Sequence, residues 1–132
     1  MNIPGNIFCE LIEAAKEDAP IEACGLLAGK DGEVTKFYRL TNADKSAEHY
    51  TMIPEEQFAA IKDMRKEGLK MLAVWHSHPE TPARMSEEDI RLAYTPDTLY
   101  TILSLADPEQ PVLKGFEMID GKPQEAEITF TA

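Results

Sequence analysis

The sequence predicts one α/β domain in which a mixed β-sheet packs between helices. Segments with apolar residues at helical spacing alternate along the chain with segments typical of buried strands. The chain has 132 residues, 43% of them hydrophobic, which is enough to bury one compact core but not two. No repeat, linker or low-complexity segment divides it. We therefore expect a single domain over residues 1–132.

The first part of the chain is expected to form a helix and then a β-hairpin. Apolar residues at helical spacing predict the helix over residues 6–18, and Pro20 ends it. The residues that carry this spacing are Ile7, Leu11, Ile12 and Ala15. Residues 26–28 and 34–40 are typical of two strands, and the connection at residues 30–32 contains the glycine that hairpin loops favour.

The middle of the chain is expected to hold a short strand, a helix and a buried strand. Residues 49–53 are interpreted as the short strand. Pro54 suits the first turn of a helix, and Gly68 suits its end. The expected buried stripe of that helix consists of Phe58, Ile61 and Met64. Residues 71–75 are apolar and bounded by charge and proline, as expected of a buried strand.

The last part of the chain is expected to begin with a helix at Ser86, where a hydroxyl and a nearby carboxylate form a typical helix start. A turn is expected at residues 95–97. Three strands should follow, over residues 99–105, 112–119 and 125–131. Gly121 and Pro123 are expected to make the turn between the last two strands.

Composition excludes several classes of function. The formal charge is −11, from 13 basic and 24 acidic residues, which argues against a nucleic-acid partner and against anionic membrane surfaces. No stretch approaches the roughly 20 apolar residues that span a bilayer. The N-terminus lacks a charged region followed by an apolar run, so no signal peptide is evident and we expect a cytoplasmic protein.

The two cysteines are not expected to form a disulfide, because a cytoplasmic chain with two cysteines has no disulfide framework. Neither has a partner at metal-ligand spacing. We expect Cys9 on or beside the apolar stripe of the first helix, and Cys24 as a small buried residue beside Glu22. A nucleophilic Cys24 is an alternative, but a metal would explain the site without it.

The strongest functional signal follows the buried strand. Alternate side chains of a strand share a face, so His76 and His78 project the same way. Asp89 would supply a third group if its helix folds back over the end of the strand. Two histidines and one carboxylate leave a tetrahedral ion one open position, which is typical of a catalytic zinc.

The residues alone leave other interpretations open. A histidine in a core is commonly just hydrogen-bonded, and Ser86 with Asp89 could be only a capping box worth about 1 kcal/mol. Two histidines and a carboxylate also form the facial triad of Fe(II) oxygenases. We interpret His49 as a surface or strand histidine, and Trp75, which faces away from His76, as a core residue.

At these residues the sequence resembles the JAMM (MPN+) metallopeptidases, the Mov34/PAD-1-like family. The family pattern is His-Ser/Thr-His, seven residues, then Ser-x-x-Asp, and residues 76–78 with Ser86 and Asp89 match it. The family also has a glutamate upstream, before a strand of small residues, and Glu22 takes that position. The resemblance runs from about residue 7 to residue 105.

The resemblance implies an MPN domain with a cytidine-deaminase-like fold and the activity of a zinc hydrolase. His76, His78 and Asp89 would bind one Zn²⁺ ion, with a water as the fourth ligand. Glu22 would be general base and then general acid, taking a proton from the water and giving it to the leaving amine. Ser86 would donate its hydroxyl to the oxyanion.

The resemblance also implies a substrate class. Eukaryotic deubiquitinating relatives grip ubiquitin with insertions for which this short chain has little room. Compact bacterial relatives act on ubiquitin-like sulfur-carrier proteins, trimming a C-terminal extension or releasing cysteine attached to the terminal Gly-Gly. We therefore expect an (iso)peptidase that hydrolyses an amide bond at the C-terminal Gly-Gly of such a carrier. A non-catalytic MPN scaffold and a plain metal-binding or structural protein are the alternatives.

Overall fold

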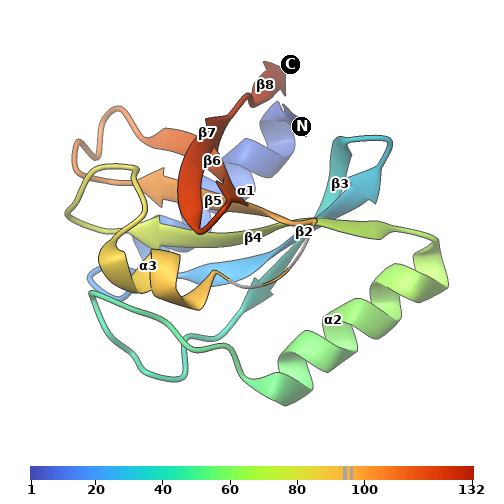
Figure 1. The fold of residues 1–132 in the computed structure, drawn as a ribbon, viewed down its shortest axis with the longest axis horizontal. Helices are drawn as coiled ribbons and strands as arrows, with labels where there is room; N and C mark the ends of the chain where they lie inside the picture. Colours follow the sequence, from blue (N-terminus) through green and yellow to red (C-terminus); the bar gives the residue numbers. More distant parts are fainter. Residues whose placement is uncertain (94, 96) are drawn as a thin grey trace.

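The computed structural model describes residues 1–93, 95 and 97–132. In this part of the chain the strands form one mixed sheet of eight strands, in the order β7-β6-β5-β4-β2-β3-β1-β8 (Figure 1). The strands are β1 (Asn2–Pro4), β2 (Cys24–Lys30), β3 (Glu33–Leu40), β4 (Lys70–His78), β5 (Leu99–Ser104), β6 (Val112–Ile119), β7 (Lys122–Ala126) and β8 (Thr129–Thr131). The helices are α1 (Gly5–Asp18), α2 (Pro54–Glu67) and α3 (Glu87–Leu92).

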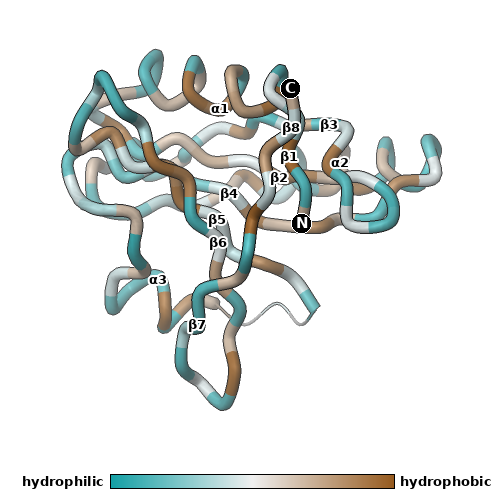
Figure 2. Tube along the Cα trace, turned by 90° about the horizontal axis from the view of Figure 1, so that it is seen from above, coloured by the Kyte–Doolittle hydropathy of each residue, from teal (hydrophilic) through white to brown (hydrophobic). Residues whose placement is uncertain are grey.

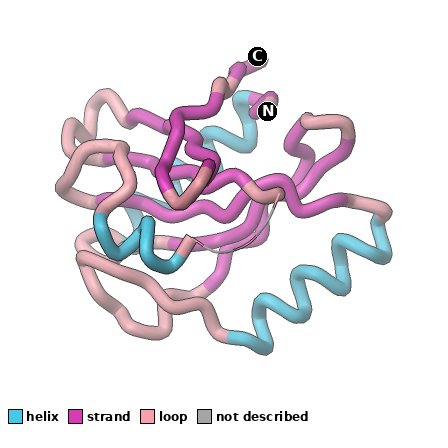
Figure 3. Tube along the Cα trace, viewed as in Figure 1, coloured by secondary structure: helices cyan, strands magenta, loops and turns pink. Residues whose placement is uncertain are grey.

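Helices cover both faces of the sheet, which confirms the predicted fold class. Figure 2 shows α1 over one face and α3 on the opposite side, and Figure 3 shows the strands between them. Leu27 of β2 packs in the core under α1, whereas Leu26 packs with Met64 of α2. Because β2 is buried on both faces, its sequence is continuously apolar or small rather than alternating. None of the described helices is both long and apolar enough to cross a membrane.

The neighbours of β4 determine what meets at its C-terminal end. β4 is antiparallel to β2, with Cys24 opposite His76, and parallel to β5, with Ile102 opposite His76. Since β2 runs against β4, the residues that precede β2 lie beside the end of β4. Trp75 is fully buried and packs edge-on against Phe37, with ring centroids 5.2 Å apart, so the prediction of a core residue is confirmed.

Residues 49–53 do not form the predicted strand. Within the described residues, this segment makes one isolated bridge, between Met52 and Asn42. The Asn42 side-chain amide instead hydrogen-bonds to the backbone of the segment. It donates to the His49 carbonyl at 3.0 Å and accepts from the Thr51 N–H at 3.2 Å. A buried side chain therefore replaces a strand ladder, and the local sequence pattern carries no sign of this substitution.

The buried stripe of α2 was predicted incorrectly at Phe58, which is 64% exposed. Ala60 and Met64, one turn apart, are the buried residues of the helix. Each residue turns an α-helix by about 100°, so Phe58 lies roughly 200° away from Ala60 and faces solvent. Gly68 ends the helix as predicted, in the left-handed conformation with φ of 70°.

The C-terminal part differs from the prediction in its last strand. β7 and β8 replace the single strand expected over residues 125–131. Asp120 and Gly121, with φ of 51° and 76°, make the tight turn between β6 and β7. Pro123 lies within β7, an edge strand where proline is tolerated, rather than in the turn. The turn expected at residues 95–97 includes residue 96 and so lies partly outside the described residues.

Strand β1 and the two cysteines remain to be compared with expectation. β1 was not anticipated, because three residues are too few to show a periodic pattern. Cys9 is exposed and lies outside the buried stripe of α1, whereas Cys24 is buried as expected. Burial raises the pKa of the Cys24 thiol to about 12, so this cysteine is protonated at neutral pH.

Candidate metal centre

The end of β4, the segment before β2 and the start of α3 meet at one place. His76 and His78 are buried on the same face of β4, with 2% and 4% of their surface exposed. Glu22 precedes β2 by two residues, so the antiparallel pairing brings it beside the end of β4. Asp89 is in the first turn of α3, and its side chain is only 6% exposed.

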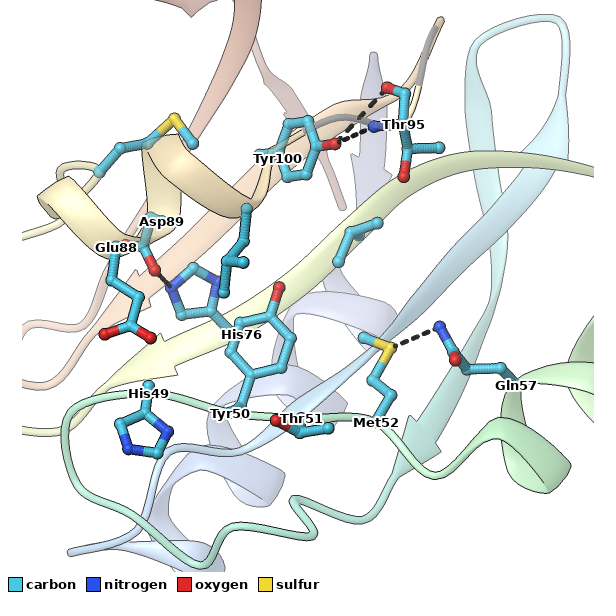
Figure 4. Close-up of a pocket in the computed structure, with 13 residues that line it drawn as sticks. His49, Tyr50, Thr51, Met52, Gln57, His76, Glu88, Asp89, Thr95 and Tyr100 are labelled. Carbon is cyan, nitrogen blue, oxygen red and sulfur yellow. Dashed lines mark hydrogen bonds and ion pairs between the residues drawn. The ribbon is translucent and has the colours of Figure 1, made fainter.

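The two imidazoles and the Asp89 carboxylate converge on a common point. The Nε2 atoms of His76 and His78 are 3.1 Å apart. Asp89 Oδ1 lies 3.3 Å from His76 Nε2, and Asp89 Oδ2 lies 3.1 Å from His78 Nε2. Figure 4 shows Asp89 reaching from α3 to the His76 ring.

These distances fit a tetrahedral metal ion. Zinc binds histidine nitrogen at about 2.0–2.1 Å, which corresponds to about 3.3–3.4 Å between neighbouring ligand atoms at the corners of a tetrahedron. The donor set of two imidazole nitrogens and a carboxylate oxygen is also one that zinc prefers. The Nδ1 of His78 lies 2.9 Å from the Pro82 carbonyl, and an N–H at that position leaves Nε2 free to bind an ion.

Glu22 completes the centre as a buried acid. Among the described residues, none hydrogen-bonds to its Oε1, although Glu22 is only 3% exposed. Its carboxylate and the ligand atoms of His76 and His78 all lie within 4.8 Å of one another. Burial raises the pKa of the Glu22 carboxyl to about 8, opposed by His78 and reinforced by Asp89. A buried carboxylate oxygen with no protein partner is costly, which indicates a place for a bound group.

The three converging side chains polarise one another. Burial alone would raise the pKa of Asp89, but hydrogen bonding to His76 and His78 reverses the effect and holds that pKa well below its usual range. Burial also lowers the pKa of His76. For His78 the same burial effect is outweighed by Asp89 and the Pro82 carbonyl, so its pKa is raised. A carboxylate that stays ionised in a buried site is suited to hold a cation.

Ser86 caps the N-terminus of α3, as the sequence analysis gave for the alternative to a catalytic role. Its Oγ accepts from the Asp89 N–H at 3.0 Å, and Asp89 Oδ2 accepts from the Ser86 N–H at 2.9 Å. Asp89 therefore caps α3 and contacts both histidines with the same carboxylate. The Ser86 residue is exposed, and accepting this bond leaves its hydroxyl hydrogen available to another partner.

Two polar residues to which the sequence analysis gave no role of their own hold Glu22 in position. Ser77, fully buried, accepts the Ala23 N–H on its Oγ at 2.8 Å and donates its own N–H to the Ala23 carbonyl at 3.0 Å. Asn42 donates to the Glu22 carbonyl at 3.0 Å. A serine inside an otherwise apolar strand, between two candidate ligands, is the sequence signal that points to Ser77.

A pocket of about 350 Å³ opens beside His76 and Asp89 (Figure 4). Its walls combine polar side chains with the apolar or aromatic side chains of Tyr50, Met52, Val74, Met85, Leu92 and Tyr100. His49 borders it from the loop before α2, with its Nδ1 3.0 Å from Asp44 Oδ2. His49 is thus a half-exposed residue at the edge of the pocket and not part of a strand.

The sequence matches a family model over residues 5–116, described as prokaryotic homologs of the JAB domain. This match covers most of the chain, including all the residues of the centre. The chain belongs to this family. The resemblance to the JAMM metallopeptidases is therefore confirmed.

Individual relatives of this chain are named as a peptidase and a protease. The chain is 32% identical to the CysO-cysteine peptidase of Mycobacterium tuberculosis over 128 residues, covering 96% of this chain and 88% of the peptidase. It is 36% identical over 92 residues to a probable TtuB-protein conjugate cleaving protease of Thermus thermophilus, covering 69% and 62% of the two chains. The chain is accordingly a hydrolase of the peptidase class.

Solved structures show the same fold. The solution structure of protein DSY2949 from Desulfitobacterium hafniense is 46% identical, with a TM-score of 0.91 over 99% of this chain and 93% of that one. AF2198 of Archaeoglobus fulgidus, a JAB1/MPN domain protein, shares the fold at 23% identity, with a TM-score of 0.67 over the whole of both chains. The centre described above therefore sits on a JAB1/MPN fold and comprises residues able to bind a metal ion.

Proposed function

We propose that this protein is a zinc-dependent peptidase that hydrolyses an amide bond at the C-terminal Gly-Gly of a ubiquitin-like or sulfur-carrier protein. The relatives support this substrate class, because they are named for releasing cysteine from CysO and for cleaving conjugates of TtuB. The observation that carries the chemistry is a buried carboxylate oxygen of Glu22 that no described residue hydrogen-bonds, beside two histidines and a second carboxylate at metal-ligand spacing.

We assign the zinc ligands as His76, His78 and Asp89. Asp89 is preferred over Glu22 as the third ligand because its oxygens lie 3.1–3.3 Å from the imidazole nitrogens, the separation expected of atoms that share one ion. When bound, zinc would lower the pKa of a coordinated water to about 7 and polarise the carbonyl of the substrate.

Glu22 is the proton carrier in this proposal. It takes a proton from the attacking water and gives it to the nitrogen of the leaving amine as the amide bond breaks. Ser77 and Asn42 act as positioning residues, since their hydrogen bonds hold the N–H and the carbonyl of the peptide group that joins Glu22 to Ala23. Burial of the carboxyl raises its affinity for a proton, which suits a group that must both accept and release one.

Ser86 is proposed to donate its hydroxyl to the carbonyl oxygen of the substrate as negative charge develops there. The cap at the start of α3 holds the Ser86 Oγ in place through the Asp89 N–H. Loss of one donor of this kind typically costs about 10²–10³ in turnover. The capping and catalytic roles of Ser86 are compatible, because capping uses its lone pair and catalysis uses its hydrogen.

Mass spectrometry of a carrier protein extended by one cysteine after Gly-Gly tests the proposal. The zinc-loaded protein should remove the cysteine and leave Gly-Gly as the new C-terminus. Glu22→Gln should bind zinc but release nothing, whereas His78→Ala should lose both zinc and activity. An unchanged carrier mass with the zinc-loaded wild type would favour the scaffold alternative, and normal turnover by Glu22→Gln would exclude Glu22 from the reaction.

A further inference from the structure

The pocket beside His76 contains a hydroxyl group that no described residue engages. The Tyr50 ring packs against the His76 imidazole, with centroids 4.8 Å apart and planes inclined by 30°. Figure 4 shows the ring beside His76 and its hydroxyl projecting from the loop into the pocket. Among the residues that the structure describes, none forms a hydrogen bond with this hydroxyl.

Three other polar side chains of the pocket have hydrogen-bond partners. The Tyr100 hydroxyl accepts from the Thr95 N–H at 2.8 Å. The Thr51 hydroxyl donates to Asp44 at 2.6 Å, and the same carboxylate lies 3.0 Å from Nδ1 of His49. Unlike these three side chains, the Tyr50 hydroxyl has no hydrogen-bond partner among the described residues, so it can donate to a ligand.

The backbone around Tyr50 is fixed on both sides. Asn42 donates to the His49 carbonyl at 3.0 Å and accepts from the Thr51 N–H at 3.2 Å. The Thr51 carbonyl in turn accepts from the Ala43 N–H at 2.8 Å. Together with the packing on His76, these bonds hold the hydroxyl in one place, and a preorganised donor binds its partner at a low entropic cost.

A peptide tail that reaches the metal centre needs such a donor. The strand that carries the histidines is paired with β2 on one side and β5 on the other, so its backbone cannot add the tail as a further strand. An extended tail nevertheless presents one carbonyl at every residue, and glycine lets the backbone come close to a ring.

We propose that the Tyr50 hydroxyl donates a hydrogen bond to a backbone carbonyl of the carrier tail, next to the amide that is cleaved. This inference rests on the proposed function and names a residue that binds that substrate. The phenol hydroxyl of a tyrosine can donate a hydrogen bond as well as accept one. Tyr50 thus holds the tail, while Glu22 and Ser86 act on the reacting atoms.

The test measures the effect of Tyr50→Phe on carrier binding in the Glu22→Gln variant, which should bind the carrier without cleaving it. Binding of the cysteine-extended carrier to zinc-loaded Glu22→Gln is measured by calorimetry, with and without Tyr50→Phe. One lost hydrogen bond of about 0.5–1.5 kcal/mol predicts binding weaker by about 2- to 13-fold. The zinc content should not change, because Phe keeps the ring against His76. In the active protein, KM should rise by the same factor while kcat changes little.

Tyr38→Phe is the matched control. The Tyr38 hydroxyl bonds to Asp63 of α2, outside the pocket, so this variant should bind the carrier as its parent does. Equal carrier binding with and without the Tyr50 hydroxyl would overturn this inference and leave the proposed function intact. A fall in kcat with unchanged KM would also overturn it, since the hydroxyl would then act on the transition state. Failure of both proteins to bind the carrier would contradict the substrate class and this inference together.

Discussion

Ser77→Ala tests how the structure positions Glu22. The Ser77 hydroxyl is fully buried and lies 54 residues from Ala23 in the sequence, yet it accepts the Ala23 N–H at 2.8 Å. Alanine would leave this N–H buried and unpaired, immediately after Glu22 in the chain. An unsatisfied buried donor costs about 1–3 kcal/mol, and we expect the free energy of unfolding to fall by that amount.

The same substitution should reduce turnover more than the loss of stability explains. A shift of about 1 Å in a catalytic group can cost about 10²-fold in rate. Without the bond to Ser77, the segment that carries Glu22 keeps only its link to Asn42 and its backbone contacts. We therefore expect kcat to fall by about 10- to 10²-fold under conditions in which the variant is fully folded.

Denaturant unfolding and steady-state kinetics of Ser77→Ala measure both effects. Thr101→Val is the control, because Thr101 is also fully buried and its hydroxyl bonds to the Val74 carbonyl at 3.0 Å, away from Glu22. It should lose stability but retain kcat. A Ser77→Ala protein with normal kcat would refute the positioning role, and one with unchanged stability would refute the energetic reasoning.

Three further predictions concern other parts of the chain. Gly25→Ala should destabilise the fold by about 1–3 kcal/mol, measured by denaturant unfolding, because the new Cβ would lie 2.4 Å from the Tyr38 carbonyl; normal stability would contradict this packing. Cys24→Ala should leave turnover unchanged in a kinetic assay, since burial keeps the thiol protonated, and loss of turnover without loss of fold would contradict this. Hydrogen bonds from Lys36, then from Tyr38, hold the pKa of Asp63 below its usual range, so their stabilisation is present at neutral pH and is lost on acidification. The stability difference between wild type and Lys36→Met should therefore shrink below about pH 4 in unfolding experiments, and a difference independent of pH would exclude the ion pair as its cause.

The sequence predicts the parts of the fold and site that depend on local patterns. His76 and His78 share a face because a strand alternates its side chains, and the start of α3 follows from a capping signal at Ser86. The position of Glu22 depends instead on antiparallel pairing between β2 and β4, which links residues more than 50 positions apart. Local periodicity cannot supply that pairing, and only the family resemblance pointed to Glu22.

Errors and omissions arise where tertiary contacts override the local pattern. Phe58 is apolar and lies at the i, i+3 helical spacing from Ile61, but the sheet meets the face that carries Ala60. Residues 49–53 have the sequence pattern of a strand, but the Asn42 side chain makes hydrogen bonds to their backbone in place of a neighbouring strand. Asn42 itself belongs to no motif, since a single buried amide leaves no periodic trace in a sequence.

Zinc stoichiometry in two variants tests the central assignment most directly. Asn at position 89 can still accept the Ser86 N–H and cap α3, so Asp89→Asn separates the cap from the metal site. After dialysis against zinc-free buffer, we predict about one zinc ion per chain in the wild type and in Glu22→Gln, and little or none in Asp89→Asn. Zinc retained by Asp89→Asn but lost from Glu22→Gln would contradict the account, because Glu22 would then be a ligand and Asp89 only a helix cap.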